Sequence, residues 1–348
     1  MQDKLAVRRG IHSACSVTNY PTGSGVKRKT EKIQLRMICI VTVFILTVIT
    51  YYIFDYLLRR LKVGGYHNRH VLVTGCDSGF GQRTAIKLDN LGFKVFAGCL
   101  TEDGKKYLSQ NCSKSVVPFL LDVRSNESIQ SALGLVKQNL PENAGLWGLV
   151  NNAGILVTAA PTELCTKSEY LASMDVNLFG LIEMTRSFLP LIRKCQGRII
   201  NTSSCAGRLA CLVPVYTLSK YGVEAYSDIL RREMYTTGIK VSIVEPGGFT
   251  TPISSGEKIL ESVQKAYNQG SEDVQSVYKV FVENFFKRIL IVQGSSNLDL
   301  VVDTYIHGLT SCFPRTRYTP GNDSKFLYIP ISYLPTCLAD WILKYNLK

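Results

Sequence analysis

Apolar residues occur in short runs from residue 70 onward, and a longer polar or helix-forming segment follows each run. This alternation is typical of βαβ units that build a parallel sheet. Six runs have the length and continuous apolar character of buried strands: 71–73, 94–97, 116–120, 146–150, 198–201 and 240–244. The pattern therefore predicts a single α/β domain over residues 66–320, with a doubly wound parallel sheet.

An uncharged apolar segment lies at residues 37–54, with basic residues on both sides. Because this length just spans a bilayer, we expect one N-terminal transmembrane helix over residues 37–58. A cleavable signal peptide would have a shorter apolar region and a small-residue cleavage site, whereas Asp55 and paired arginines follow here. Both flanks are basic, so the charge pattern leaves the orientation open. Residues 1–36 lack an apolar period and are expected to form a flexible basic arm, with a transit peptide as the alternative.

The strand pattern stops at residues 250–297, where a helix-forming insert contains Tyr267, Tyr278, Phe281, Phe285 and Phe286. Such an insert can cover a substrate pocket, but each aromatic side chain can equally pack the insert onto the domain. The tail, residues 321–348, contains Leu334, Leu338, Trp341 and Ile342. We expect the tail to be either membrane-associated or a packed helix.

The positive charge is concentrated at one end of the chain. Of the net charge of +13, residues 1–70 carry +9, so the remainder is nearly balanced. A basic excess beside an apolar segment is typical of a membrane flank, and a nucleic-acid partner is therefore not expected. The eleven cysteines and four histidines form no ligand pattern, so no metal site is expected either.

A glycine-rich loop follows the first predicted strand. Its sequence is Thr74-Gly75-Cys76-Asp77-Ser78-Gly79-Phe80-Gly81, and a helix-forming segment comes directly after it. Gly75 permits a tight turn, Gly79 lets the backbone approach a pyrophosphate, and Gly81 allows close helix packing. Its position between a strand and a helix predicts a dinucleotide site in a Rossmann-type fold.

Four further motifs follow in order: Asn151-Asn152-Ala153-Gly154, then Ser204, then Tyr216 with Lys220 four residues later, and then Pro246-Gly247. With these motifs the chain resembles the short-chain dehydrogenase/reductase family, from about residue 66 to the C-terminus. The resemblance implies catalysis by Asn177, Ser204, Tyr216 and Lys220, with Ser204 and Tyr216 contacting the substrate. It implies cofactor contacts by Thr74, Gly75, Asp77, Ser78, Gly79, Phe80, Gly81, Asp122, Val123, Asn152, Ala153, Gly154, Tyr216, Lys220, Pro246, Gly247 and Thr250.

The chemistry of hydride transfer fits these residue types. An alcohol carbon can lose a hydride only as its hydroxyl proton is removed, and a phenol with a pKa near 10 needs nearby positive charge to act as that base. Lys220 lies on the same helical face as Tyr216 and is expected to supply this charge. Ser204 can hydrogen-bond the substrate oxygen. The resemblance gives Asn177 the role of positioning a water molecule in a proton relay.

The cofactor is predicted from the residues expected near the adenosine ribose. NADP enzymes usually place an arginine or lysine there. Neither Ser78 nor the end of the second strand is basic, and Glu102 would repel a phosphate, so NAD is favoured over NADP. Lys105 and Lys106 are close enough in sequence to keep NADP as the alternative.

Several segments, among them 314–318 and 329–341, resemble the microsomal retinol and hydroxysteroid dehydrogenase branch of the family. This implies NAD-dependent oxidation of retinol or of 3α- and 17β-hydroxysteroids at the endoplasmic reticulum membrane, in a branch that commonly forms homodimers. The alternatives are a mitochondrial D-3-hydroxybutyrate dehydrogenase, whose substrate carboxylate would need a cation such as Lys287 or Arg288, and a non-catalytic cofactor-binding scaffold. The apolar insert and the membrane segment favour a hydrophobic substrate.

Overall fold

The computed structural model describes residues 23–210, 213–253, 255–289 and 294–347, which fall into two compact units, Met1–Leu58 and Arg59–Lys348. Helix α1 (Gly23–Arg60) accounts for the described part of the first unit. The sequence predicted a flexible basic arm as far as residue 36, and the helix begins within it at Gly23, where lysine, arginine, glutamate and glutamine are good helix formers. The rest of the predicted arm, residues 1–22, lies outside the described residues.

Helix α1 contains the predicted transmembrane segment. Over Glu31–Arg60 its most apolar part has a mean hydropathy of 2.5, and the helix is long and apolar enough to cross a membrane. A helix satisfies its own backbone hydrogen bonds, as a segment in lipid must. The sequence pattern and the helix length therefore agree on this segment.

A seven-stranded sheet forms the centre of the second unit, in the order β3-β2-β1-β4-β5-β6-β7, and every neighbouring pair is parallel. The strands are β1 (His70–Thr74), β2 (Lys94–Cys99), β3 (Val116–Leu120), β4 (Gly148–Asn151), β5 (Arg198–Thr202), β6 (Lys240–Val244) and β7 (Arg317–Tyr318). The six predicted strands are present with ends that differ by at most two residues. The seventh, β7, was not predicted because two residues give no readable period.

Helices cover both faces of the sheet, as a doubly wound fold requires. Val71 and Val73 of β1 face one core, whereas Leu72 between them faces the other, because side chains alternate along a strand. The first core is closed by α2 (Gly79–Asn90), α3 (Glu102–Asn111) and α10 (Asp299–Thr310). The second is closed by α4 (Asn126–Asn139), α6 (Leu181–Lys194) and α7 (Pro214–Glu233).

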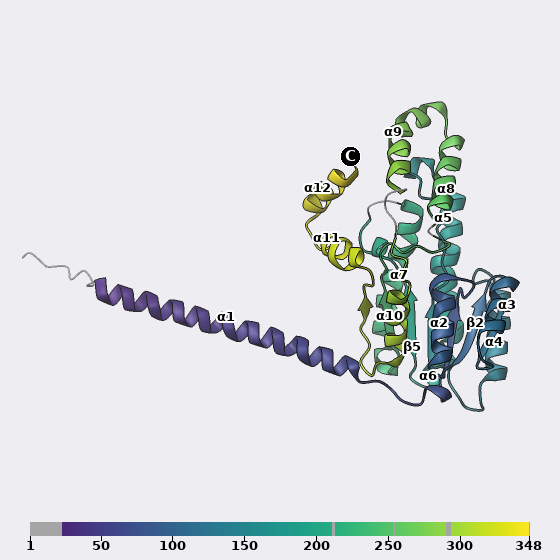
Figure 1. Cartoon of the computed structure of the whole chain (residues 1–348), viewed down its shortest axis with the longest axis horizontal. Helices are drawn as coiled ribbons and strands as arrows, with labels where there is room; N and C mark the ends of the chain where they lie inside the picture. The colour runs from purple at the N-terminus through teal and green to yellow at the C-terminus, as the bar shows by residue number, and fades with distance from the viewer. Residues whose placement is uncertain (1–22, 211–212, 254, 290–293, 348) are drawn as a thin grey trace, which may run out of the picture. The chain divides into compact units, whose positions relative to one another are not determined.

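The predicted insert is a helical hairpin of α8 (Gly256–Gln269) and α9 (Glu272–Ile289), which extends beyond the end of the sheet (Figure 1). Its aromatic side chains Tyr267, Tyr278, Phe281 and Phe285 pack around Ala159, Ala160, Leu164, Val263, Ala266 and Val282. The packing role expected for these aromatics is therefore the one they fill. The side chain of Phe286 lies outside the described residues.

The chain ends in three short helical segments after β7: η6 (Ser324–Tyr328), α11 (Ile329–Ile331) and α12 (Thr336–Leu347). Ile331 and Ala339 are buried with Leu209, and Ile342 packs against them. Tyr333 and Trp341 are 71% and 70% exposed. The tail thus packs one side onto the domain and exposes large apolar groups on the other.

Candidate active site

A cavity of about 1590 Å³ lies along the carboxyl ends of the strands, where ligands bind in open α/β sheets. The predicted site residues that line it are Gly75, Asp77, Ser78, Gly79, Phe80, Asp122, Val123, Asn152, Ala153, Gly154, Ser204, Tyr216, Lys220, Pro246, Gly247 and Thr250. Thr74, Gly81 and Asn177 do not line it. The fold thus brings nearly all predicted site residues together.

The glycine loop connects β1 to α2. Gly75 and Gly79 have φ angles of 68° and 60°, in the left-handed region that favours glycine. A Cβ on Gly81 would lie 2.5 Å from Asn152 Nδ2 and 2.8 Å from the carbonyl carbon of Gly75. Helix α2 can therefore start against the loop and the end of β4 only if residue 81 has no side chain.

Thr74 was expected to contact the cofactor, but it lies behind the cavity wall. It is 1% exposed, and its hydroxyl accepts hydrogen bonds of 3.0 Å from the backbone amides of both Asn152 and Ala153. The side-chain amide of Asn152 in turn donates to the backbone carbonyls of Thr74 and Gly75, at 2.9 and 3.1 Å. Thr74 and Gly81 therefore shape the cofactor loop from outside the cavity, which is a correction to the predicted contacts.

Asp77 joins the glycine loop to the end of β2. Its carboxylate accepts hydrogen bonds of 2.8 Å from the backbone amides of Leu100 and Thr101, and one of 2.7 Å from the Thr101 hydroxyl. Leu100 and Thr101 both line the cavity. Asp77 therefore fixes the segment that was expected to face the adenosine ribose, a function that its sequence motif alone did not indicate.

Asp122 lies just after β3 and forms an ion pair of 2.6 Å with Arg124. The hydrogen bond from Arg124 lowers the pKa of the Asp122 carboxyl, although partial burial opposes the shift. Both side chains line the cavity. Arg124 is thus a cavity cation that is already paired with an acid.

Ser204, Tyr216 and Lys220 meet in the cavity wall. Ser204 follows β5, whereas Tyr216 and Lys220 lie one turn apart on α7. The Lys220 ammonium lies 5.5 Å from the centroid of the Tyr216 ring and donates a hydrogen bond of 2.9 Å to the carbonyl of Thr202. Lys220 is 3% exposed, so its charge is held in a site largely shielded from water.

Burial is the main influence on the pKa values of Tyr216 and Lys220. Burial raises the pKa of the Tyr216 phenol to about 12, and a hydrogen bond with Ser204 opposes the rise. Burial lowers the pKa of the Lys220 ammonium to about 8, and the charge of Glu224 opposes this fall. For both groups the loss of hydration on burial is the largest cause of the shift. The phenol therefore needs further positive charge to act as a base.

Asn177 lies in a π-helical turn, η3 (Asp175–Gly180), between α5 (Lys167–Met174) and α6. It is 1% exposed, and its amide nitrogen donates to the Ile155 carbonyl and the Ser219 hydroxyl, both at 2.9 Å. The Ile155 amide donates to its side-chain oxygen at 2.8 Å. The Asn177 side chain thus connects the segment just after Gly154 to Ser219 on α7.

Tyr305 of α10 is a buried polar residue that the sequence analysis did not single out. Its phenol shares a hydrogen bond of 2.8 Å with the Thr202 hydroxyl and donates to the side-chain oxygen of Asn152 at 3.3 Å. It is completely buried, and burial raises its pKa well above the ordinary value. Tyr305 thus connects the ends of β4 and β5 beneath the cavity. A tyrosine inside an apolar helix gives no sequence signal for this contact.

A buried charge cluster lies behind α7, and the sequence analysis did not anticipate it. Arg317 forms ion pairs with Glu224, with Glu245 at 2.5 Å and with Asp228 at 2.9 Å. Arg208 pairs with Glu245 at 3.1 Å. Glu224 lies on α7, one turn after Lys220. Glu245 directly follows β6, and Arg317 lies in β7. The cluster therefore fixes α7 against β6 and β7. The sequence singled out the segment around Arg317 as similar to one branch of the family. It gave no sign of these ion pairs, because their partners are far from Arg317 in the sequence.

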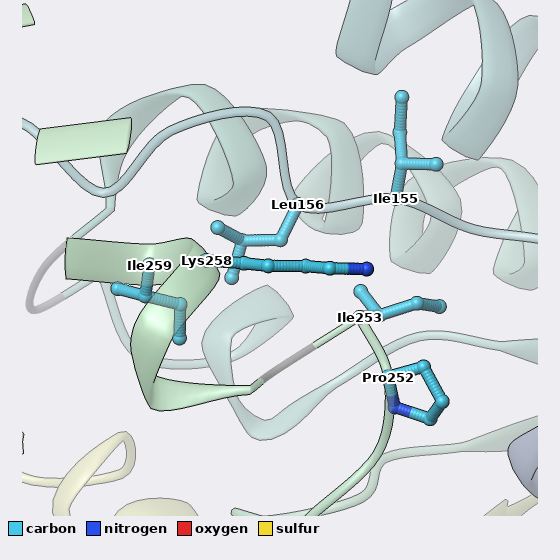
Figure 2. A pocket seen from close by; sticks show the side chains of 6 residues that line it. All are labelled: Ile155, Leu156, Pro252, Ile253, Lys258 and Ile259. Carbon is cyan, nitrogen blue, oxygen red and sulfur yellow. The ribbon is translucent and has the colours of Figure 1, made fainter. Parts of the chain in front are cut away.

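A smaller pocket of about 280 Å³ opens beside the main cavity and shares most of its lining (Figure 2). Ile155, Leu156, Pro252, Ile253 and Ile259 make it apolar, and Lys258 contributes the one charged side chain. Lys258 was not singled out from the sequence, because a lysine in the first turn of a polar helix resembles any solvated surface lysine. The side chains of Lys287 and Arg288, expected as cations near a substrate, lie outside the described residues.

The fold, the glycine loop and the Tyr216–Lys220 pair define a dehydrogenase of the short-chain type. The family model for short chain dehydrogenases matches residues 69–259, and the chain belongs to this family of nicotinamide-dependent oxidoreductases. Retinol dehydrogenase 7 of Rattus norvegicus is 45% identical, with 82% of this chain and 90% of that protein covered. The 17-beta-hydroxysteroid dehydrogenase type 6 of Bos taurus is also 45% identical, with 84% and 93% covered.

Retinol dehydrogenase 16 of Homo sapiens is 42% identical, with 84% of this chain and 93% of that protein covered. Among solved structures, a short-chain dehydrogenase from Streptomyces avermitilis has a TM-score of 0.62 at 23% identity, and covers 80% of this chain and 98% of its own. Levodione reductase has a TM-score of 0.61 at 21% identity, with 75% and 100% covered. These structures confirm the predicted fold.

Proposed function

We propose that this protein is a membrane-bound dehydrogenase that uses NAD to oxidise a hydrophobic secondary or allylic alcohol, of the retinoid or hydroxysteroid class. The observation that carries the proposal is the shared cavity wall of Ser204, Tyr216 and Lys220, beside the glycine loop. The names of the relatives support the substrate class, since they are retinol and 17-beta-hydroxysteroid dehydrogenases.

Each side chain has a distinct part in this proposal. Bound NAD supplies the hydride acceptor and the positive charge of its pyridinium ring. Tyr216 takes the hydroxyl proton of the alcohol, and Lys220, whose pKa of about 8 keeps it mostly protonated at neutral pH, stabilises the phenolate that must form first. Ser204 hydrogen-bonds the substrate oxygen. In carbonyl reduction Tyr216 returns the proton, and its raised pKa keeps the phenol protonated before that step.

Asn177 contributes by position. Its amide group holds Ile155 next to Gly154, and a Cβ on Gly154 would lie 3.3 Å from the Asn177 oxygen and 3.6 Å from Lys220 Nζ. The backbone after β4 is therefore fixed against the lysine. We propose that Asn177 keeps the distance between the cofactor wall and Lys220, rather than contacting the substrate.

The basic side chains of the cavity are already engaged with other groups, which favours NAD over NADP. Of the residues that line it in the described part of the chain, Arg124 and Lys220 are basic. Arg124 forms an ion pair with Asp122, and Lys220 donates a hydrogen bond to the backbone carbonyl of Thr202. The segment after β2, where an extra phosphate on the ribose would lie, presents Leu100 and Thr101 fixed by Asp77. A 2′-phosphate would find no unpaired cation among these residues.

The membrane is the proposed source of the substrate. Helix α1 is long enough to anchor the chain, and α12 presents exposed Leu338 and Trp341 while its other side packs on the domain. Tryptophan beside leucine is typical of an interfacial contact. We propose a single-pass protein of the endoplasmic reticulum membrane, whose tail rests on the lipid surface.

The test is turnover by the full-length protein in detergent or microsomes, followed by NADH or NADPH absorbance. We expect oxidation of retinol or androsterone, with kcat/KM for NAD at least about tenfold above that for NADP. Oxidation of 3-hydroxybutyrate alone would contradict the substrate class. A preference for NADP would contradict the cofactor assignment. Cofactor binding without turnover of any alcohol would indicate a scaffold.

A further inference from the structure

The pocket in Figure 2 places an ammonium group among apolar side chains. Ile155 and Leu156 form one side, Ile253 and Ile259 form another, and Lys258 extends from α8 across the space between them. Such a lining contacts hydrocarbon well and also presents one positively charged group. A neutral retinoid or steroid would use the apolar side chains and leave the charge without a role.

Lys258 takes part in no hydrogen bond or ion pair within the part of the chain that the structure describes. Its neighbour Glu257 borders the main cavity but does not line this pocket. Lys258 also lies in the first turn of α8, where the helix dipole disfavours a cation. Lys258 is exposed, so water can solvate its ammonium, and the same ammonium is accessible to an anionic ligand at the pocket.

The pocket lies close to the reacting groups. A Cβ on Gly154 would be 3.6 Å from Lys220 Nζ, and Ile155 and Leu156 follow Gly154 directly. Successive Cα atoms are about 3.8 Å apart, so this wall begins within roughly 4–8 Å of Gly154.

We propose that this pocket binds the carboxylate of a substrate, and that the protein oxidises hydrophobic hydroxy acids, such as hydroxylated long-chain fatty acids. This rests on the function proposed above. The carbinol carbon loses a hydride to the nicotinamide, the hydroxyl proton passes to Tyr216, and the C–O bond becomes a carbonyl. The carboxylate remains unchanged and pairs with Lys258, while the hydrocarbon chain occupies the apolar cavity.

The test compares matched substrates and matched variants of the full-length protein. Hydroxyoctadecanoic acids with the hydroxyl at different carbons are assayed with NAD, beside their methyl esters, which lack the charge. The variants are Lys258→Gln and Lys265→Gln. Lys265 is an exposed lysine on the same helix that lines neither cavity, so it controls for loss of surface charge.

We expect Lys258→Gln to lower kcat/KM for the best acid by about 5–10-fold and to change kcat/KM for its ester less than about twofold. Lys265→Gln should change neither. An equal effect on acid and ester, or no effect on the acid, would overturn the proposal. The acid preference should peak at one range of hydroxyl positions, because the carboxylate would bind at Lys258 while the carbinol carbon must lie beside Tyr216.

Binding separates this proposal from the proposed reaction. In a Tyr216→Phe background, calorimetric titration with the acid and NADH reports the pocket without turnover. Weaker acid binding on adding Lys258→Gln, with ester binding unchanged, would support the carboxylate site even if no alcohol is oxidised by the wild type. Unchanged acid binding would overturn the site, even if retinol and androsterone are good substrates.

Discussion

Gly81→Ala tests how closely α2 is packed against the cofactor loop. The new Cβ would lie 2.5 Å from Asn152 Nδ2 and 2.8 Å from the Gly75 carbonyl carbon, well inside ordinary contact at 3.4–4 Å. The contact on Gly75 is a backbone atom, and the side-chain amide of Asn152 is held by hydrogen bonds to two backbone carbonyls. Neither neighbour can therefore move away easily. Helix α2 must shift, and the loop that it positions must shift with it.

Overpacking of this kind costs typically about 1–3 kcal/mol, and we expect the upper end because backbone is involved. For a domain of this size, 1 kcal/mol lowers Tm by about 2–4 °C, so a loss of about 3 kcal/mol corresponds to about 6–12 °C. Affinity for NAD should fall as well, because Gly75 and Gly79 line the cavity and Gly81 fixes their loop.

Thermal unfolding of the full-length protein in detergent, followed by tryptophan fluorescence, measures the stability change. Gly134→Ala is the matched control, because that glycine lies inside α4 with nothing within 4 Å of a Cβ. Alanine there should stabilise the helix by about 0.5–1 kcal/mol. If Gly81→Ala unfolds within about 2 °C of the wild type and binds NAD equally well, the close approach described here is incorrect.

Three further perturbations test other parts of the structure. Arg317→Met leaves Glu224, Glu245 and Asp228 without their shared cation. We expect the free energy of unfolding, measured by thermal unfolding, to fall by about 3–5 kcal/mol. A fall of less than about 1 kcal/mol would show that the cluster is not formed. Burial raises the pKa of Glu224 from 4.5 to about 7, so the folded state binds this proton more tightly than the unfolded state does. The stability that this group contributes is therefore lost as the pH rises from about 4.5 to about 7. Unfolding free energy should therefore drop by about 2 kcal/mol between about pH 5 and 7.5, and by less in Glu224→Gln; equal slopes would refute this. Deleting residues 1–61 should release the protein from carbonate-washed membranes, and retention would mean that the tail anchors it.

The sheet and the cofactor loop could be predicted from sequence because both are local patterns. Apolar runs marked the strands β1 to β6, and the glycine spacing after β1 marked the loop. Tyr216 and Lys220 are one helical turn apart, so their proximity also followed from local geometry. The motif order then identified the family, which the relatives and the family match confirm.

Other features depend on contacts between distant segments, and local patterns could not reveal them. Strand β7 is two residues long and owes its place to pairing with β6. Tyr305 reaches Thr202 and Asn152 only after α10 packs on the sheet. Burial raises the pKa of Tyr216, and burial cannot be read from a four-residue spacing.

The role of Tyr216 as the proton acceptor is tested most directly by steady-state turnover of Tyr216→Phe, with NAD binding measured on the same preparation. Tyr221→Phe, a change five residues further along α7 at an exposed tyrosine that does not line the cavity, is the control. We predict that Tyr216→Phe lowers kcat by about 10²–10⁴-fold with NAD affinity nearly unchanged, while Tyr221→Phe remains active. Turnover by Tyr216→Phe close to that of the wild type would contradict the account.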